Sequence, residues 1–479
     1  MTFILKLLLI KQLLNRIIMK LNLLSTFLFF IAFNGFNQNE FAENWHFGDS
    51  VNLDFTSGMP VASNNSSIFS YEGCVSVSDE EGNLLFYSNG GNISNASDGG
   101  VWNRDHQVMP NGHLYDTAGC YSSIQSSIVT SKVGSPDQYY LFTMDCIESQ
   151  QTSLAHYKGL RYTVVDMALD GGLGDVTSEK GIPLLNDPGL FLSEGIAATS
   201  HSNGDDYWLI VHSEAPDSMN RFYVYSISST GISGPSIQDL GLYSYGQMKF
   251  NIDGNRFSNG SSVFNFNKTN GTLSNPIDLG VSGTGKAFSN SGQYLYQTTV
   301  LTLYQYDLFA TDVAASRTTI HSGNIFDFDM IGSMQRGPDC KIYVAVLAMN
   351  YVGVINSPDL SGTACNYVKD QVSLPSYSCQ LGLPNFIESD FRSCNTSGIF
   401  EETNYQLNLY PNPSRKNITV DIDHSLVGSE FEIVDIFGKT VFKSHFNNLS
   451  NIVTLSEYAD GVYFLKVNGT DTFMRFVKG

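Results

Sequence analysis

The sequence predicts an all-β protein: a seven-bladed β-propeller followed by a small β-sandwich. One strand-turn pattern recurs six times between Glu72 and Ile387. Matching glycines Gly204, Gly254 and Gly292 recur at intervals of roughly 40–50 residues, which suits a four-stranded blade. The composition has 13% aromatic and 15% charged residues with 43 glycines, which favours short strands joined by tight turns. No long window beyond the N-terminal segment shows a 3.6-residue apolar period, which argues against a helical fold.

Each copy of the pattern has an inner apolar strand, a polar turn that often contains Gly, an aromatic-rich strand and a third alternating strand. The turn and second strand read, in order, "SDEEGNLLFYS", "GSPDQYYLFT", "SNGDDYWLIV", "NIDGNRFSNG", "SNSGQYLYQT" and "GPDCKIYVAV". The third strands read "GGVWNRD", "GLRYTVVDM", "RFYVYSI", "SVFNFNK", "LYQYDL" and "VGVINS". Alternation with a period of two is the signature of strands with one buried face.

The seventh blade is predicted to combine both ends of the repeat region. "LGLPNFI" (Leu381–Ile387) has the character of an inner strand with nothing after it, whereas "NWHFG" (Asn44–Gly48) has that of a second strand without a first. "VNLDFTSGMPVAS" then supplies the third and fourth strands. Joining them closes the ring and removes exposed sheet edges. Residues 41–392 then form the propeller with roughly 50 residues per blade, and six or eight blades remain alternatives.

The N-terminal residues 1–38 have the pattern of a targeting segment. Lys and Arg precede the apolar run Leu21–Phe33, as in the n-region and h-region of a signal peptide. Met19 is an alternative start that would give a signal of ordinary length. A membrane anchor is the other interpretation, but the run is short for a bilayer span. We expect cleavage between Ala32 and Glu40, and no transmembrane anchor in the mature chain.

Residues 406–479 follow a polar linker at 393–405 and show the alternation of a small β-sandwich. They contain "LNLYPNPSRKNITVDI", "FEIVDIFGKTVFKS", "LSEYADGVYFLKVNG" and "FMRFVKG". This segment resembles the C-terminal sorting domain of cargo of the type IX secretion system of Bacteroidetes. The resemblance implies that the secretion machinery is a partner and that the protein is secreted or held at the outer cell surface. The residues that match the family's pattern are Pro411, Pro413, Gly438, Asp460, Gly461 and Lys478. Turn chemistry within the domain is the alternative reason for them.

The repeat region also resembles a family of secreted Bacteroidetes proteins with propeller-like repeats before a sorting domain. The residues that carry the resemblance are "WHFGDSVNLDFTSGMPV", "EGCVSVSDEEGNLLFYSNG", "VWNRDHQVMPNG", "LRYTVVDMALDGGLGDV" and "GLPNFI". The resemblance implies fold and compartment but no activity.

The net charge and the absence of several catalytic and metal-binding motifs reduce the number of possible functions. A net charge of −20 argues against nucleic acid and anionic membranes as partners, because both require basic patches. The sequence has no HExxH, CxxC or GxSxG motif and no phosphate loop ending in GK[ST], so we expect no metal, no cofactor and no catalytic residues. Two functions remain: a non-catalytic binding or adhesion module for an extracellular glycan or protein, or a secreted hydrolase or lyase acting on extracellular polysaccharide or protein.

Link lengths predict which face of the propeller binds a ligand. The links between strands one and two, and three and four, are short, as in "DEEG" and "NSGQ". The links on the other face are long over blades one to three, and binding residues tend to lie on long loops of a rigid frame. Ordinary solvated surface is an equally weighted alternative. The candidate contacts are Asp98, Asp116, Tyr121, Glu148, His156, Glu194 and Glu214.

The seven cysteines test the blade assignment, since an exported protein can form disulfides. Cys120 and Cys146 fall on the long-link face of blade two, so we expect a bridge between them. Cys340 and Cys365 fall on the opposite face of blade six, and we expect a second bridge there. Cys74, in an apolar strand, is expected to be a buried thiol, and the pairing of Cys379 and Cys394 stays open.

Overall fold

The structure is a computed structural model that describes residues 41–391 and 408–479. The gaps in it are 92–98, 116–118, 148–157, 186–189, 215–220, 241–244, 325, 327–328, 376–378, 423–428, 436–438 and 468–472. The chain divides into two compact units, residues 1–394 and 395–479, and each is treated by itself.

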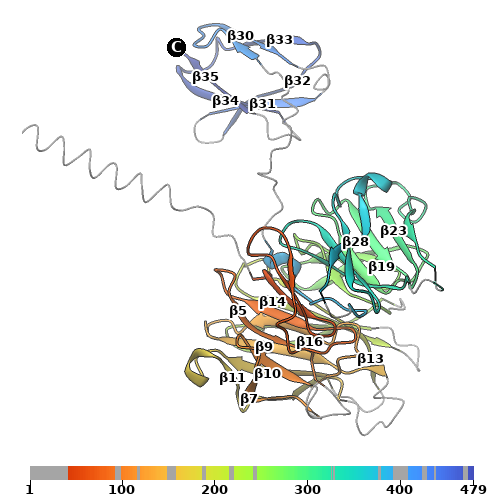
Figure 1. Ribbon diagram of the computed structural model, residues 1–479. Helices are drawn as coiled ribbons and strands as arrows, with labels where there is room; N and C mark the ends of the chain where they lie inside the picture. Colours follow the sequence, from red (N-terminus) through yellow and green to blue (C-terminus); the bar gives the residue numbers. More distant parts are fainter. Residues whose placement is uncertain are drawn as a thin grey trace, which may run out of the picture. The chain divides into compact units, whose positions relative to one another are not determined.

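The first unit contains six successive antiparallel sheets, each built from strands that are consecutive in the chain (Figure 1). Blade one contains β4 (Val75–Ser78), β5 (Leu84–Ser88), β6 (Gly100–Asn103) and β7 (Val108–His113). Blade two contains β8 (Ser127–Ser131), β9 (Gln138–Met144), β10 (Leu160–Asp166), β11 (Asp175–Val176) and β12 (Ile182–Leu185). Blade three contains β13 (Phe191–Ser200), β14 (Tyr207–Glu214), β15 (Arg221–Ser228) and β16 (Gly231–Asp239).

Blade four contains β17 (Lys249–Phe250), β18 (Arg256–Asn259), β19 (Ser262–Asn267) and β20 (Thr272–Asp278). Blade five contains β21 (Gly285–Phe288), β22 (Tyr294–Thr298), β23 (Thr302–Asp307) and β24 (Thr318–Ser322). Blade six contains β25 (Ile331–Arg336), β26 (Ile342–Val346), β27 (Tyr351–Ile355) and β28 (Tyr367–Ser373). Short 3₁₀ turns occupy Asp170–Gly172, Gly362–Cys365 and Glu388–Asp390.

The sheets are arranged as a ring. The first strand of each sheet contacts the first strand of the next, in the order β4, β8, β13, β17, β21 and β25. A ring of four-stranded antiparallel sheets whose first strands surround one axis is a β-propeller. The predicted fold class is therefore confirmed, and blade two differs from the expected pattern because two short strands, β11 and β12, both pair with β10.

The seventh position of the ring is filled from both ends of the unit. The N-terminal strands β1 (Asn44–Phe47), β2 (Val51–Asp54) and β3 (Val61–Ser63) form a three-stranded sheet. The segment 381–387 lies between blades six and one: the Ser333 amide donates to the Leu381 carbonyl at 2.8 Å, and the Asn385 amide donates to the Cys74 carbonyl at 2.8 Å. The segment thus holds the inner position of blade seven.

One detail of the predicted closure is wrong. The segment 381–387 forms no ladder with β1 in the described structure, and its strand-like pairing is a single parallel bridge between Pro384 and Cys74. Pro384 has no amide hydrogen to donate to a ladder. The N-terminal strands and the closing segment contact each other instead through side chains: the ring of Trp45 in β1 lies 5.8 Å from that of Phe386.

Aromatic side chains fill the spaces between neighbouring sheets. Trp45 is fully buried, with its ring 5.0 Å from Phe55 and 5.2 Å from Tyr343 of blade six. Phe222 of blade three packs against Phe257 of blade four at 5.8 Å. Alternation along each strand places one aromatic row on each blade interface, which is how many short strands bury a large core.

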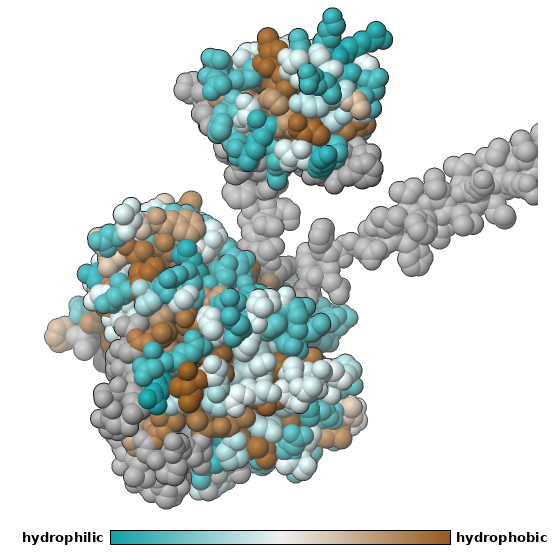
Figure 2. Space-filling view, turned by 180° about the vertical axis from the view of Figure 1, so that it is seen from behind, coloured by the Kyte–Doolittle hydropathy of each residue, from teal (hydrophilic) through white to brown (hydrophobic). Residues whose placement is uncertain are grey.

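The second unit is a β-sandwich, as the sequence predicts. One sheet contains β29 (Asn408–Tyr410), β30 (Asn417–Asp421) and β33 (Ser450–Thr454), and the other contains β31 (Glu430–Asp435), β32 (Thr440–His445), β34 (Gly461–Val467) and β35 (Phe473–Lys478). Ile418, Ile433, Leu465 and Phe476 belong to one buried cluster that both sheets share. On the visible face of each unit, hydrophobic side chains are interspersed with hydrophilic ones (Figure 2).

Candidate functional site

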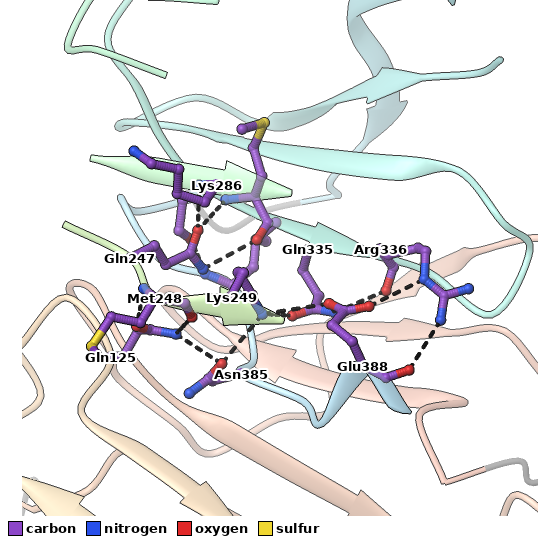
Figure 3. A network of polar contacts seen from close by, with 12 residues as sticks. Gln125, Gln247, Met248, Lys249, Lys286, Gln335, Arg336, Asn385 and Glu388 are labelled. Carbon is purple, nitrogen blue, oxygen red and sulfur yellow. Dashed lines mark hydrogen bonds and ion pairs between the residues drawn. The ribbon is translucent and has the colours of Figure 1, made fainter. Parts of the chain in front are cut away.

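The axis of the propeller is filled by protein, so its centre is not an open channel. Asn385 reaches it from the closing segment, and its Nδ2 donates to the carbonyls of Ser127 and Ile196 at 3.2 Å each. Its Oδ1 accepts from Gln125 Nε2 at 3.0 Å (Figure 3). These bonds join the closing segment to the first strands of blades two and three.

Beside Asn385, one buried carboxylate is the shared ion-pair partner of two buried basic side chains. Glu388 Oε2 accepts from Arg336 Nε at 3.1 Å, and Glu388 Oε1 lies 3.6 Å from Lys249 Nζ (Figure 3). The three side chains are only 8%, 3% and 2% exposed, respectively. Burial lowers the pKa of Lys249, and the charge of Glu388 opposes this effect. Because each basic side chain has its ion-pair partner inside the protein, we interpret this cluster as structural.

The axial amides were missed by sequence reasoning, although a signal exists. Gln125 stands at the start of the inner strand in "SSIQSSIV", and Gln247 holds a similar place in "SYGQMKF". Gln247 Oε1 accepts from the amides of Lys286 and Met334 at 2.9 and 3.1 Å. A recurring buried amide at the start of inner strands could have identified them as links between blades.

At the long-link end of the axis the surface has a hollow of about 230 Å³. Most of its lining comes from residues that directly precede inner strands or begin them. Tyr71 and Val300 at its rim are 37% and 52% exposed. The lining residues are Tyr71, Glu72, Ile124, Tyr245, Thr284, Val300, Met330, Ile331, Gly332, Ser333, Leu347 and Leu381. The hollow therefore lies on the predicted face, but over the axis and not over blades one to three alone.

Tyr121 and Glu194, the predicted contact residues whose side chains the structure describes, do not line this hollow. Asp98, Asp116, Glu148 and His156 lie outside the described residues, and Glu214 is described only as the backbone end of β14. The ring of Tyr121 packs edge-on against Phe69 at 5.5 Å.

Glu194 is 4% exposed, and its carboxylate binds backbone groups of the propeller. Its carboxylate oxygens accept from the amides of Ile147 and Ile124 at 2.7 and 3.2 Å. Glu194 thereby holds the link that carries Ile124, which lines the hollow, but Glu194 itself does not line the hollow.

The expected bridge of blade two is present. Cys120 and Cys146 form a disulfide with a Cα–Cα distance of 5.5 Å. Asp145 lies beside them, and the three side chains could in principle surround a metal ion. A cysteine binds zinc as its thiolate, however, and both sulfurs are in the disulfide. Asp145 instead accepts from the amides of Cys146 and Lys158 at 2.9 and 2.6 Å.

The expected bridge between Cys340 and Cys365 is wrong. Cys365 is a free, fully buried thiol in the core cluster of blades five and six, near Tyr296. Cys340 is disulfide-bonded, but to another residue. Cys340 lies in the first hairpin turn of blade six, whereas Cys365 precedes the outer strand β28, so a shared face does not bring them together. Cys74 is a buried free thiol as predicted, and Cys379 is another.

A Ser–His pair between blades seven and one tests the enzymatic alternative. His46 Nδ1 lies 2.9 Å from Ser66 Oγ, and Asn52 Nδ2 lies 3.3 Å from His46 Nε2. The Asn52 amide nitrogen can only donate, and the Asn52 amide oxygen already accepts from the Ser63 hydroxyl, so Nε2 of His46 must accept and Nδ1 carries the proton. That proton points at Ser66, so His46 cannot remove the hydroxyl proton as a general base would. Burial, and to a lesser degree the charge of His106, lowers the pKa of His46 to about 3, which keeps the ring neutral.

In the second unit, the sorting residues that the structure describes lie after β29, at the start of β34 and at the end of β35. Lys478 Nζ lies 2.6 Å from Asp460 Oδ1, and Gly461 pairs with Lys478 in the β34–β35 ladder. Pro411 and Pro413 flank Asn412, whose side chain bonds the carbonyl of Arg475 and the amide of Val477 at 3.1 and 2.9 Å. Gly438 lies outside the described residues. The sequence singled out the prolines, but Asn412 makes the contacts that attach the entry turn to the last strand.

The described residues form a propeller in the first unit and a β-sandwich in the second. Residues 408–477 match the model of the secretion system C-terminal sorting domain, so the chain carries that domain. No curated protein matches the chain in sequence. No helix in the described part of the chain has the length and hydropathy needed to cross a bilayer.

Three solved structures show how far the likeness in fold extends. A protein from Lactobacillus plantarum is 12% identical over 76% of this chain and 98% of its own, with a TM-score of 0.37. A protein of unknown function from Bacteroides caccae is 11% identical over 54% of this chain and 85% of its own, with a TM-score of 0.30. A catalytically inactive virginiamycin B lyase from Staphylococcus aureus, solved with quinupristin, is 10% identical over 74% and 96%, with a TM-score of 0.30. At these values the likeness carries no functional argument.

Proposed function

We propose that this protein is a non-catalytic binding module that the type IX secretion machinery delivers to the outer cell surface or the medium. The sorting domain at residues 408–477 supports export. The binding role is supported by one observation above all, the hollow of about 230 Å³ at the long-link end of the axis. It is concave, mainly apolar and held by rigid strand ends, which are the properties of a ligand site.

The chemistry of the lining favours binding over catalysis. Tyr71 and Tyr245 offer aromatic rings, Thr284 and Ser333 offer hydroxyl groups, and Glu72 is the one carboxylate among the lining residues. Most glycosidases use two carboxyl groups that flank the scissile bond. Aromatic faces with a few polar groups suit an extracellular glycan or an exposed protein segment, and we assign the site to a ligand of this kind.

The test is a binding screen of the recombinant propeller on a glycan array and on extracellular proteins, repeated with Tyr245→Ala. Replacing the ring should weaken binding of any hit at least tenfold, because an aromatic anchor contributes on the order of 2 kcal/mol. The matched control is Phe309→Ala, which removes a ring that is 63% exposed in the strand three–four link of blade five, on the opposite face. Hits that lose no affinity in Tyr245→Ala would place the ligand elsewhere, and turnover of a bound polymer would show that the protein is an enzyme.

A further inference from the structure

A second cavity opens on the short-link face, at the opposite end of the axis from the hollow. Its volume is about 70 Å³, and its walls include Val75 and Val77 of blade one and Val129 of blade two. Five aromatic rings also line it: Phe41, Tyr139, Tyr207, Phe386 and Phe391. Such a density of rings gives a cavity whose surfaces carry negative partial charge on the ring faces.

Asp390 contributes a carboxyl group to this cavity. Removal from water raises its pKa to about 7, and hydrogen bonds from the Tyr207 and Ser389 hydroxyls oppose that rise. Asp390 retains partial exposure to solvent. The carboxyl therefore ionises near neutral pH.

Asp390 forms no ion pair within the described part of the chain. Arg336 stacks on the Phe391 ring at 4.5 Å, but its ion-pair partner is Glu388, which it shares with Lys249. Lys268 is the remaining nearby cation, and its Nζ donates to the Asp253 carbonyl. The charge of Lys268 favours the ionised form of Asp390, but among the described residues no cation forms a salt bridge with this carboxylate.

Thr130 provides a second, independent polar group. It lines the cavity, is 2% exposed, and its hydroxyl has no hydrogen-bond partner among the described residues. An unpartnered buried hydroxyl costs about 1–3 kcal/mol, so a group that bonds it would be stabilised there. A hydroxyl can accept a hydrogen bond as well as donate one, so it suits a cationic donor as well as a neutral ligand.

We propose that this cavity binds the primary ammonium group of an aliphatic amine. The carboxylate of Asp390 supplies the charge, the Thr130 hydroxyl accepts one N–H, and the ring faces attract the cation. The volume is about half that of a cavity known to hold benzene, roughly 150 Å³, so a slender aminoalkyl group fits better than a bulky quaternary one. This site is independent of the proposed ligand hollow and lies on the other face.

The full secreted chain should be titrated with butylammonium chloride at pH 8, with binding followed by isothermal calorimetry. Asp390→Asn should weaken binding at least tenfold, while Asp205→Asn, an exposed residue in the turn before β14, should leave it unchanged. Lowering the pH from 8 to 6 should weaken wild-type binding roughly tenfold, because a carboxyl with a pKa near 7 loses most of its charge over that range. This pH profile keeps the proposal testable even if Asp390→Asn does not fold.

Two further ligands separate the alternatives. n-Butanol has the same shape without the charge, and equal binding of butanol would overturn the proposal by showing a merely apolar cavity. Nα-acetyl-lysine methylamide tests the source of the amine: affinity within threefold of butylammonium indicates a lysine side chain, and much weaker affinity indicates a free amine. Absence of saturable butylammonium binding at both pH values would also overturn it.

Discussion

Replacing Glu388 with Gln should destabilise the whole propeller. The carboxylate is the shared partner of Lys249 and Arg336, at 3.6 and 3.1 Å, and both cations are at most 3% exposed. Removing one partner of a buried ion pair costs about 3–5 kcal/mol, because the remaining charge is left in a medium of low polarity. A glutamine oxygen can still accept one hydrogen bond, so we expect a loss of about 3 kcal/mol.

Urea unfolding followed by tryptophan fluorescence measures this loss. The chain has three Trp, and Trp45, Trp102 and Trp208 all lie in the propeller at 9% exposure or less, so the signal reports that unit alone. The matched control is Glu179→Gln, which breaks a surface pair with Lys132 at 3.4 Å. Exposed pairs contribute about 0–1 kcal/mol, so this variant should barely change the midpoint.

The double variant Lys249→Met with Glu388→Gln separates charge from packing. An apolar side chain removes one of the two unpaired cations, and replacing buried charges by apolar groups is often neutral or stabilising. The double variant should therefore be more stable than Glu388→Gln alone. If Glu388→Gln loses no more stability than Glu179→Gln, the axial cluster does not hold the ring closed and our reasoning is refuted.

Three further outcomes follow from the contacts described above. His46 has a pKa of about 3 in the native state against 6.5 in the unfolded state, so its contribution to the free energy of unfolding is complete above pH 6.5 and decreases as the pH falls. Between pH 8 and 5 this free energy should fall by about 2 kcal/mol in the wild type but not in His46→Gln. Equal pH dependence of the two proteins in urea unfolding would contradict this. Deleting residues 406–479 should leave a folded propeller in the periplasm, and wild-type amounts in the medium would disprove the sorting role. Cys120→Ser opens a loop with a sequence separation of 26 and should cost about 3 kcal/mol, while Cys365→Ser, at a free thiol, should not change the non-reducing peptide map.

The sequence was sufficient to predict the ring because its evidence is local. Each blade is a run of consecutive strands, and a polar turn followed by an aromatic strand such as Tyr294–Thr298 marks it within about ten residues. The closing segment 381–387 was also recognisable, since an apolar run without a following hairpin needs partners from elsewhere. Its lack of a ladder with β1 was not, because the choice between backbone pairing and the Trp45–Phe386 contact depends on the space left by the other blades.

The candidate site was harder to predict than the fold. The long links and the hollow lie on the same face, but residue type alone could not separate Glu194, which bonds the amides of Ile124 and Ile147, from a carboxylate open to a ligand. Asp390 was not proposed because it follows the repeats and has no motif around it. The cavity forms only where blades one and two meet the returning chain, so its parts are distant in sequence.

The edge of each inner strand explains why the axis contains amides. A first strand has one neighbour in its own sheet, so its other edge leaves backbone N–H and C=O groups facing the axis, where water is excluded. A carboxylate can only accept and a lysine can only donate, but an amide does both. Gln125 accepts from the Met248 amide at 2.7 Å and donates to the Met248 carbonyl at 3.1 Å. Gln247 likewise accepts from the Met334 amide and donates to the Met334 carbonyl, both at 3.1 Å. Each glutamine thereby completes the edge of a strand two blades away, which joins alternate blades directly and leaves the two ends of the axis as the places where a ligand can enter.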